Sequence, residues 1–270
     1  MKIFIGLANI TSLFHEYAKG FRELGHEVFT VETVTTPPYV DGVQDVDLNV
    51  HTLASQRAER EKGGLEAYNK WYAHYMELAW QKALDSDFCL FIWKTFRPDC
   101  HDLVELKRRG IKLAVRFCGA EVRVNHAADQ FTDYLQRPPM NRPTGKSPEK
   151  ALHYVRMAEK FADVILGASE IGLRPMHSAS AMMVDMEQIP VLPAQRECPV
   201  ILHAPSGRSR KGTTEWLQIF EALRNERHKF GLKFCERIPH QDFLKEYATA
   251  DIYCGSLNIR HGGGTWGIGL

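Results

Sequence analysis

Basic and small residues gather in the segment Pro205–Thr213, whose composition suits the binding of an anion. Arg208, Arg210 and Lys211 supply positive charge, and Gly212 lets the backbone approach a ligand closely. The segment follows an apolar strand pattern and precedes a helical one, so the free N–H groups of a helix start would face the same ligand. A phosphate or diphosphate fits these donors. A solvated basic loop is the alternative, and the GxxxxGK[ST] spacing of a Walker A loop is absent.

A run of glycines near residue 270 offers similar chemistry. The segment His261–Gly267 follows a strand pattern, and glycines in that position bring backbone N–H groups up to an anion. Gly264 and Gly267 are the candidate donors. A flexible end of the chain is the alternative interpretation.

A further candidate site follows the expected strand at 112–117. Ligands of open parallel sheets bind beyond the carboxyl ends of strands, and Cys118 and Gly119 occupy that position. Gly119 permits a tight turn beside a ligand. Glu121 and Arg123 either line the site or form a surface ion pair.

The segment that follows the first expected strand is another candidate site. Asn9 lies there, where it either contacts a ligand or stabilises a turn. The segment lacks the GxGxxG fingerprint of dinucleotide-binding folds, which argues against an NAD-dependent enzyme.

The elements that position these residues alternate between strand and helix. Such alternation with short links predicts parallel sheets and an α/β fold. The expected strands are 2–8, 28–31, 88–93, 112–117, 164–166, 200–203, 232–238 and 252–254, and the expected helices are 13–24, 65–84, 99–109, 149–162, 213–223 and 241–248. Residues 36–64 and 124–148 are expected to be long loops, the first with one small helix at most. A proline-rich segment over 190–199 separates two Rossmann-type units, 1–190 and 191–270, and the second has too few strands to be complete.

Composition narrows the classes of partner. The 270 residues are 44% apolar and 25% charged, and their formal net charge of +1 gives no reason to expect a nucleic-acid partner. Six dispersed cysteines without a CxxC pair argue against a metal site and for reduced thiols. No apolar run is long enough to span a membrane, and the first residues do not form a signal peptide, so a cytoplasmic protein is expected.

The aromatic residues of the helix at 65–84 pack on a core or contact a membrane or a partner.

Taken together, several segments resemble glycosyltransferases of the GT-B fold, in particular the retaining family 4. The quoted segments are F-R-E-L-G-H-E-V at 21–28, F-C-G-A-E-V-R at 117–123, A-E-K-F-A-D-V-I at 158–165, H-A-P-S at 203–206, K-G-T at 211–213, I-P-H at 238–240 and Y-A-T-A-D-I at 247–252. Each segment alone is weakly specific, whereas their joint order along nearly the whole chain is fairly specific.

The resemblance implies a transfer of sugar from a UDP- or GDP-sugar to a glycan or small-molecule acceptor, without a metal or a cofactor. It implies that Lys211, helped by Arg208, holds the donor diphosphate, and that Gly264 and Gly267 donate backbone N–H groups to it. By the same resemblance Gly119 lines the acceptor side of the cleft.

Two departures from the family pattern bear on activity. Cys118 stands where the family has a histidine, and a thiol is a weaker donor than an imidazole. The family's pair of glutamates that contacts the donor sugar and ribose would follow residue 270. The sequence therefore predicts an inactive, C-terminally truncated glycosyltransferase. The alternative is a non-catalytic nucleotide- or sugar-binding protein or a remnant of such an enzyme.

Overall fold

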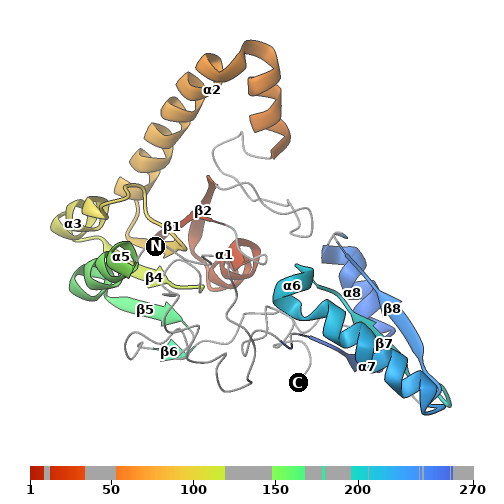
Figure 1. Cartoon of the computed structure of the whole chain (residues 1–270). Helices are drawn as coiled ribbons and strands as arrows, with labels where there is room; N and C mark the ends of the chain where they lie inside the picture. The colour runs from red at the N-terminus through yellow and green to blue at the C-terminus, as the bar shows by residue number, and fades with distance from the viewer. Residues whose placement is uncertain are drawn as a thin grey trace. The chain divides into compact units, whose positions relative to one another are not determined.

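The computed structural model divides the chain into two compact units (Figure 1). Unit 1 comprises Met1–Thr36 and Gly42–Ala181, and unit 2 comprises Pro37–Asp41 and Met182–Leu270. The structure describes residues 1–8, 13–33, 53–118, 148–167, 178–179, 196–205, 207–236, 238, 240–255 and 257. Both units contain a parallel sheet with helices, which confirms the α/β prediction. The predicted boundary between residues 190 and 191 lies outside the described residues.

Unit 1 is built on a six-stranded sheet in the order β2-β1-β3-β4-β5-β6, in which every neighbouring pair is parallel. The strands are β1 (Lys2–Leu7), β2 (Glu27–Glu32), β3 (Phe88–Ile92), β4 (Lys112–Arg116), β5 (Val164–Gly167) and β6 (Ser178–Ala179). The chain passes from β1 to β2 on one side and then to β3 on the other. This reversal of direction beside β1 is the kind of switch point at which open α/β sheets bind ligands.

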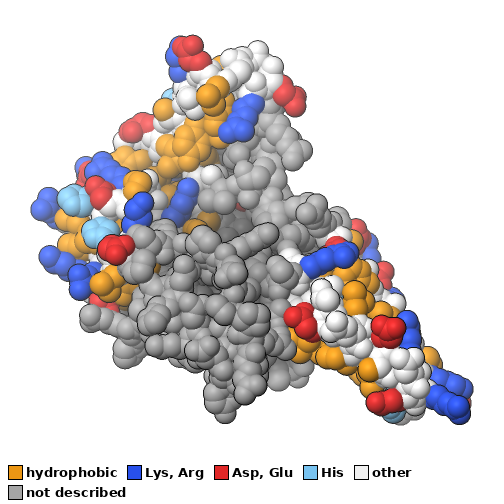
Figure 2. Space-filling view, viewed as in Figure 1, with side chains coloured by type: hydrophobic (Ala, Val, Ile, Leu, Met, Phe, Trp, Pro, Cys, Tyr) orange, Lys and Arg blue, Asp and Glu red, His pale blue; other side chains and the backbone are white. Residues whose placement is uncertain are grey.

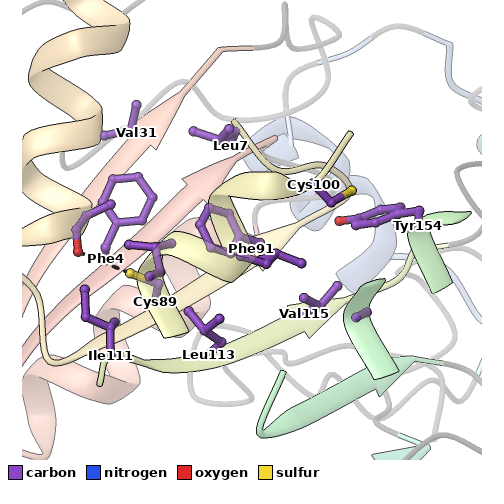
Figure 3. Packing of buried hydrophobic residues seen from close by; sticks show 14 of the residues in the cluster. Phe4, Leu7, Val31, Cys89, Phe91, Cys100, Ile111, Leu113, Val115 and Tyr154 are labelled. Carbon is purple, nitrogen blue, oxygen red and sulfur yellow. Dashed lines mark hydrogen bonds between the residues drawn. The ribbon is translucent and has the colours of Figure 1, made fainter. Parts of the chain in front are cut away.

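Helices cover both faces of this sheet. Within the described residues, the helices of this unit are α1 (Leu13–Glu23), α2 (Leu53–Leu84), α3 (His101–Arg108) and α5 (Pro148–Phe161). On one face α1 packs through Phe21 against Phe88 of β3, with ring centroids 6.1 Å apart. On the other face α2, α3 and α5 bury one apolar cluster, in which Phe4, Phe91 and Leu113 of three strands lie together (Figure 3).

Helix α2 corrects the prediction of a loop over 36–64, because the helix begins at Leu53 rather than near Leu65. The residues from Ala54 to Lys62 are strong helix formers, and the two glycines that follow gave the appearance of a start. Gly64 instead makes a kink with φ 70° and ψ −163°, which glycine adopts without steric cost. Tyr75 packs in the core, which is one of the two alternatives given for the aromatic residues of this helix, whereas Leu78 is exposed.

The described residues of unit 2 form a three-stranded parallel sheet in the order β8-β7-β9. The strands are β7 (Val200–His203), β8 (Gly231–Phe234) and β9 (Ile252–Tyr253), and the helices are α6 (Arg208–Lys211), α7 (Thr213–Asn225) and α8 (His240–Ala248). Phe220 of α7 packs with Ile201 and Cys254, while Phe243 of α8 lies edge-on to Tyr253. The chain again passes from the first strand to one side and then to the other, so the carboxyl ends of β7 and β9 flank a switch point.

An aspartate clamp recurs at the amino ends of the strands in both units. In each clamp an aspartate stands directly before one strand and exchanges two hydrogen bonds with the neighbouring strand. Its carboxylate accepts from a backbone N–H, and its own N–H donates to the carbonyl of the same residue. The pairs are Asp87 with Lys2 (2.7 and 2.9 Å), Asp163 with Leu113 (2.9 and 2.8 Å) and Asp251 with Val200 (2.6 and 2.8 Å).

The clamps fix the register at the amino edge of each sheet. The clamped N–H belongs to the first residue of β1 and of β7 and to the second residue of β4. Where the donor is buried, as at Leu113, leaving it unsatisfied costs about 1–3 kcal/mol. Asp163 also accepts from Lys107 Nζ at 2.6 Å. Burial raises the pKa of the Asp163 carboxyl, but the hydrogen bonds from Lys107 and Leu113 outweigh it and hold the pKa below its usual range. The ionised carboxylate is therefore the form that stabilises unit 1.

Replacing Asp163 by alanine is expected to lower the free energy of unfolding of the chain by about 1–3 kcal/mol, because the Leu113 N–H loses its acceptor. Urea denaturation at pH 7 measures this loss. In the wild-type protein the same contribution should disappear as the pH falls below about 4, where the carboxyl group becomes protonated. Asp85→Ala, at an exposed position, is the matched control. Equal losses for the two variants would contradict the clamp's role.

Candidate functional site

The turn that joins β7 to α7 contains more structure than the predicted loop. Residues Arg208–Lys211 form the short helix α6, and Gly212 follows with φ 67° and ψ 38°. These angles lie in the left-handed region that favours glycine, which explains Gly212 at this position. Gly212 is also the N-cap of α7 and provides no side-chain cap. Thr213 and Thr214, the first two residues of α7, are therefore not its N-cap.

The absence of a capping side chain shapes the start of α7. The Trp216 N–H donates to the Gly212 carbonyl at 2.9 Å and so begins the helical ladder. The first-turn N–H groups that precede it receive no acceptor from the cap residue. They add to the partial positive charge at the amino end of the 13-residue helix. This end adjoins the carboxyl end of β7, the central strand of the unit 2 sheet.

Lys211 and Gly212 lie at this helix start, as the sequence predicted. The Lys211 side chain is half-buried, and Gly212 is buried. The Lys211 ammonium group is near enough to His203 to disfavour a second positive charge there. The carbonyl of Lys211 accepts the N–H of Leu257 at 3.2 Å. The turn is thereby joined to the chain that follows β9.

Arg208, the predicted helper of Lys211, forms an ion pair in this structure. Its Nε and Nη2 donate to the two carboxylate oxygens of Glu236 at 2.8 and 2.6 Å. The guanidinium also lies 5.3 Å from the centre of the Phe234 ring. The turn is thus connected to the end of β8, through a residue that the sequence analysis did not consider. A bidentate pair holds the guanidinium plane in one orientation.

His203 is the residue of this site that the sequence analysis missed, although it belongs to the quoted H-A-P-S segment. Its side chain is 1% exposed, at the end of β7. Nδ1 lies 2.7 Å from the Cys254 carbonyl, and Nε2 lies 2.9 Å from the Thr213 hydroxyl. A carbonyl only accepts, so Nδ1 carries the proton and Nε2 accepts from Thr213. The signal in the sequence was a polar residue inside an apolar strand.

The His203 imidazole is neutral in the folded protein. Burial lowers its pKa, and the nearby Lys211 ammonium lowers it further, against the hydrogen bond to Cys254. A neutral ring satisfies both partners without placing a charge in the interior. It therefore serves as a connection between β7, β9 and α7.

A second hydrogen bond connects α7 to the end of β9. The indole N–H of Trp216 donates to the Gly255 carbonyl at 3.1 Å. Together with the Leu257–Lys211 bond, it brings the chain after β9 to the start of α7. The other predicted donors, Gly264 and Gly267, lie outside the described residues.

In unit 1 the structure describes one of the predicted acceptor-side residues, Cys118, which is half-buried just beyond β4. Asn9, Gly119, Glu121 and Arg123 lie outside the described residues. Before Cys118, at the end of β4, the structure places a buried Arg116 that the sequence analysis did not single out. Its Nη1 donates to the Tyr17 hydroxyl of α1 at 3.2 Å. Unit 1 thus has a buried guanidinium at the carboxyl edge of its sheet.

Within the described residues, no group of three or more His, Cys, Asp and Glu side chains is arranged to hold a metal ion. The described helices include none that is long and apolar enough to cross a membrane. The face shown in Figure 2 carries positive and negative side chains side by side, in keeping with the net charge of +1. An anion site on this protein must depend on local groups.

Comparison with known proteins gives a similarity at the level of solved structures. No family model and no curated protein match the chain. One similar structure is UGT73P12 of Glycyrrhiza uralensis, solved with glycyrrhetinic acid 3-O-monoglucuronide. The match covers 94% of this chain and 72% of the UGT73P12 chain, at 10% sequence identity and a TM-score of 0.37. Another is MurG of Acinetobacter baumannii, for which the match covers 93% of this chain and 72% of the MurG chain, at 11% sequence identity and a TM-score of 0.38. Both are GT-B glycosyltransferases, and at these scores the similarity carries no argument about activity.

The pH dependence of stability tests the neutral state of His203. In the unfolded chain a histidine takes up a proton near pH 6.5, whereas the folded protein resists protonation of His203. The stability of the wild-type protein should therefore fall as the pH drops from about 7 to 5, by at most about 1.4 kcal/mol per pH unit for this group. His203→Asn should lack that component.

Urea denaturation at several pH values measures the effect. His228→Asn is the matched control, because His228 is an exposed histidine of the same unit. If His203→Asn and the wild-type protein lost stability in parallel on acidification, the neutral buried imidazole would be contradicted.

Proposed function

We propose that this chain binds the diphosphate of a nucleotide sugar at the turn between β7 and α7, as the donor side of a glycosyltransferase of the GT-B type. One observation carries the proposal. Lys211, the left-handed Gly212 and the uncapped first turn of α7 occur together at the carboxyl end of the central strand. A diphosphate suits a helix start with a lysine beside it.

The proposed chemistry needs no metal or cofactor. Transfer of a sugar expels a nucleoside diphosphate, and fixed positive charge stabilises that leaving group as it forms. Lys211 supplies the charge, and the start of α7 supplies backbone N–H groups. Arg208 assists by turning from Glu236 toward the diphosphate or by holding the end of β8 in place. Gly264 and Gly267 would add further N–H donors, as the family resemblance implies.

The proposal assigns the acceptor to unit 1. A glycan or a small molecule would bind beyond the carboxyl ends of β1 and β4, where Asn9, Cys118, Gly119, Glu121 and Arg123 occur in the sequence. The switch point beside β1 favours a ligand at that edge. The donor, a UDP- or GDP-sugar, and the retaining stereochemistry are parts of the same proposal.

Lys211→Ala tests the donor site. A charge-assisted contact contributes about 1.5–3 kcal/mol, so the variant should bind the nucleoside diphosphate about 10- to 150-fold more weakly than the wild-type protein. Calorimetric titration of the chain with UDP and, separately, with GDP measures this change.

Lys229→Ala is the matched control, since Lys229 is an exposed lysine of the same unit. It should bind like the wild-type protein. A wild-type protein that bound neither nucleotide would overturn the proposal, and so would equal affinities of the two variants. Binding without sugar transfer to any of a panel of acceptors would favour the non-catalytic nucleotide-binding alternative.

A further inference from the structure

Buried hydrogen bonds join three separate segments around the proposed donor turn. The Thr213 hydroxyl donates to His203 Nε2, and His203 Nδ1–H donates to the Cys254 carbonyl. The end of β7, the start of α7 and the end of β9 therefore share one connected set of bonds. Thr213 and His203 are each 1% exposed, so water does not compete for these bonds.

We infer that Thr213 and His203 are positioning residues for the donor diphosphate, in that their hydrogen bond fixes the direction of the first-turn N–H groups of α7. This inference rests on the function proposed above and adds a role for side chains that do not touch the ligand. The family resemblance assigned the diphosphate to Lys211 and to glycines, and gave no role to either residue.

The place of Thr213 in α7 supports a positioning role. Thr213 is the first helical residue after the left-handed Gly212, where the direction of the chain is least constrained by the helix. Threonine near a helix start commonly caps the helix with its hydroxyl. Here the hydroxyl points to the interior and holds the helix start against β7 instead. The Thr213 side chain is therefore part of the interior hydrogen bonds and not of a cap.

The neutral charge of His203 suits the same role. A protonated ring would lie near the Lys211 ammonium, and burial opposes that state. The neutral ring accepts a hydrogen bond from Thr213 and donates one to Cys254. It therefore holds the start of α7 and the end of β9 in place without adding a charge to the interior. The Phe234 and Trp216 rings, with centroids 5.7 and 6.2 Å from the imidazole, pack beside it. Its orientation is thus determined from both sides of β7.

Two further hydrogen bonds join the start of α7 to the chain that follows β9. Trp216 lies one turn along α7 from Thr213, and its indole donates to Gly255, directly after Cys254. Leu257 then reaches back to the carbonyl of Lys211. The chain at the end of β9 is thus hydrogen-bonded at Cys254, Gly255 and Leu257 to the residues around the start of α7. Preorganised N–H donors bind an anion more strongly than donors that must first be ordered.

Paired substitutions at Thr213 separate positioning from a general effect on folding. Thr213→Val keeps the shape of the side chain and removes the hydroxyl, whereas Thr213→Ser keeps the hydroxyl. Calorimetric titration of the full chain with UDP and GDP should show the valine variant binding at least about 10-fold more weakly, and the serine variant within about 3-fold of wild type. Urea denaturation of each variant gives the folded fraction to which affinities are referred.

Trp216→Phe provides a second test in case the valine variant fails to fold. It keeps an aromatic ring in the apolar cluster of α7 and removes the donor to Gly255. We expect it to remain folded and to bind about 3- to 10-fold more weakly, on the same scale as one lost neutral hydrogen bond.

The outcomes distinguish the two proposals. A wild-type protein that binds neither nucleotide overturns the proposed function and this inference with it. A wild-type protein that binds, together with folded valine and phenylalanine variants of unchanged affinity, overturns this inference alone. Weaker binding by the valine variant that the serine variant restores supports it, because loss of stability alone would leave the affinity of the folded protein unchanged.

Discussion

The aspartate clamps are the constraint on which both units depend. Each clamp satisfies an otherwise unpaired N–H at the amino edge of a parallel sheet, and it fixes two neighbouring strands in one register. Side-chain periodicity in a strand is two, so a slip of one residue would turn an apolar face toward water. With one edge fixed in this way, the loops at the other edge can vary without disturbing the core. The proposed donor turn and the predicted acceptor segments all occur at that other edge.

Around the proposed donor turn, several polar side chains form hydrogen bonds or ion pairs with one another and so join neighbouring segments of unit 2. His203 and Thr213 satisfy each other in the interior, and Arg208 is paired with Glu236. The groups proposed to meet an anion are Lys211 and the backbone at the start of α7. A site of this kind has a geometry determined by packing and by hydrogen bonds within unit 2. Its chemistry depends on the backbone as much as on the side chains.

Much of the fold followed from the sequence, because strand and helix patterns alternate clearly along the chain. The early start of α2 was missed, since paired glycines resemble a boundary and only the structure shows that Gly64 makes a kink. The role of Thr213 was also missed. A threonine before a helical pattern favours a cap, and its partner His203 is ten residues away in a strand. Contacts between segments distant in sequence leave no periodic signal, which explains why Glu236 and Arg116 were not identified either.

The clamps also bear on the order of events in folding. Their hydrogen bonds join residues 85, 50 and 51 positions apart, so each closes a long loop that contains at least one helix. Contacts of such high sequence separation form slowly compared with helices and turns. We therefore expect the helices of each βαβ unit to form before its clamp closes. The aspartates would then act chiefly by slowing the unfolding of a sheet that is already assembled.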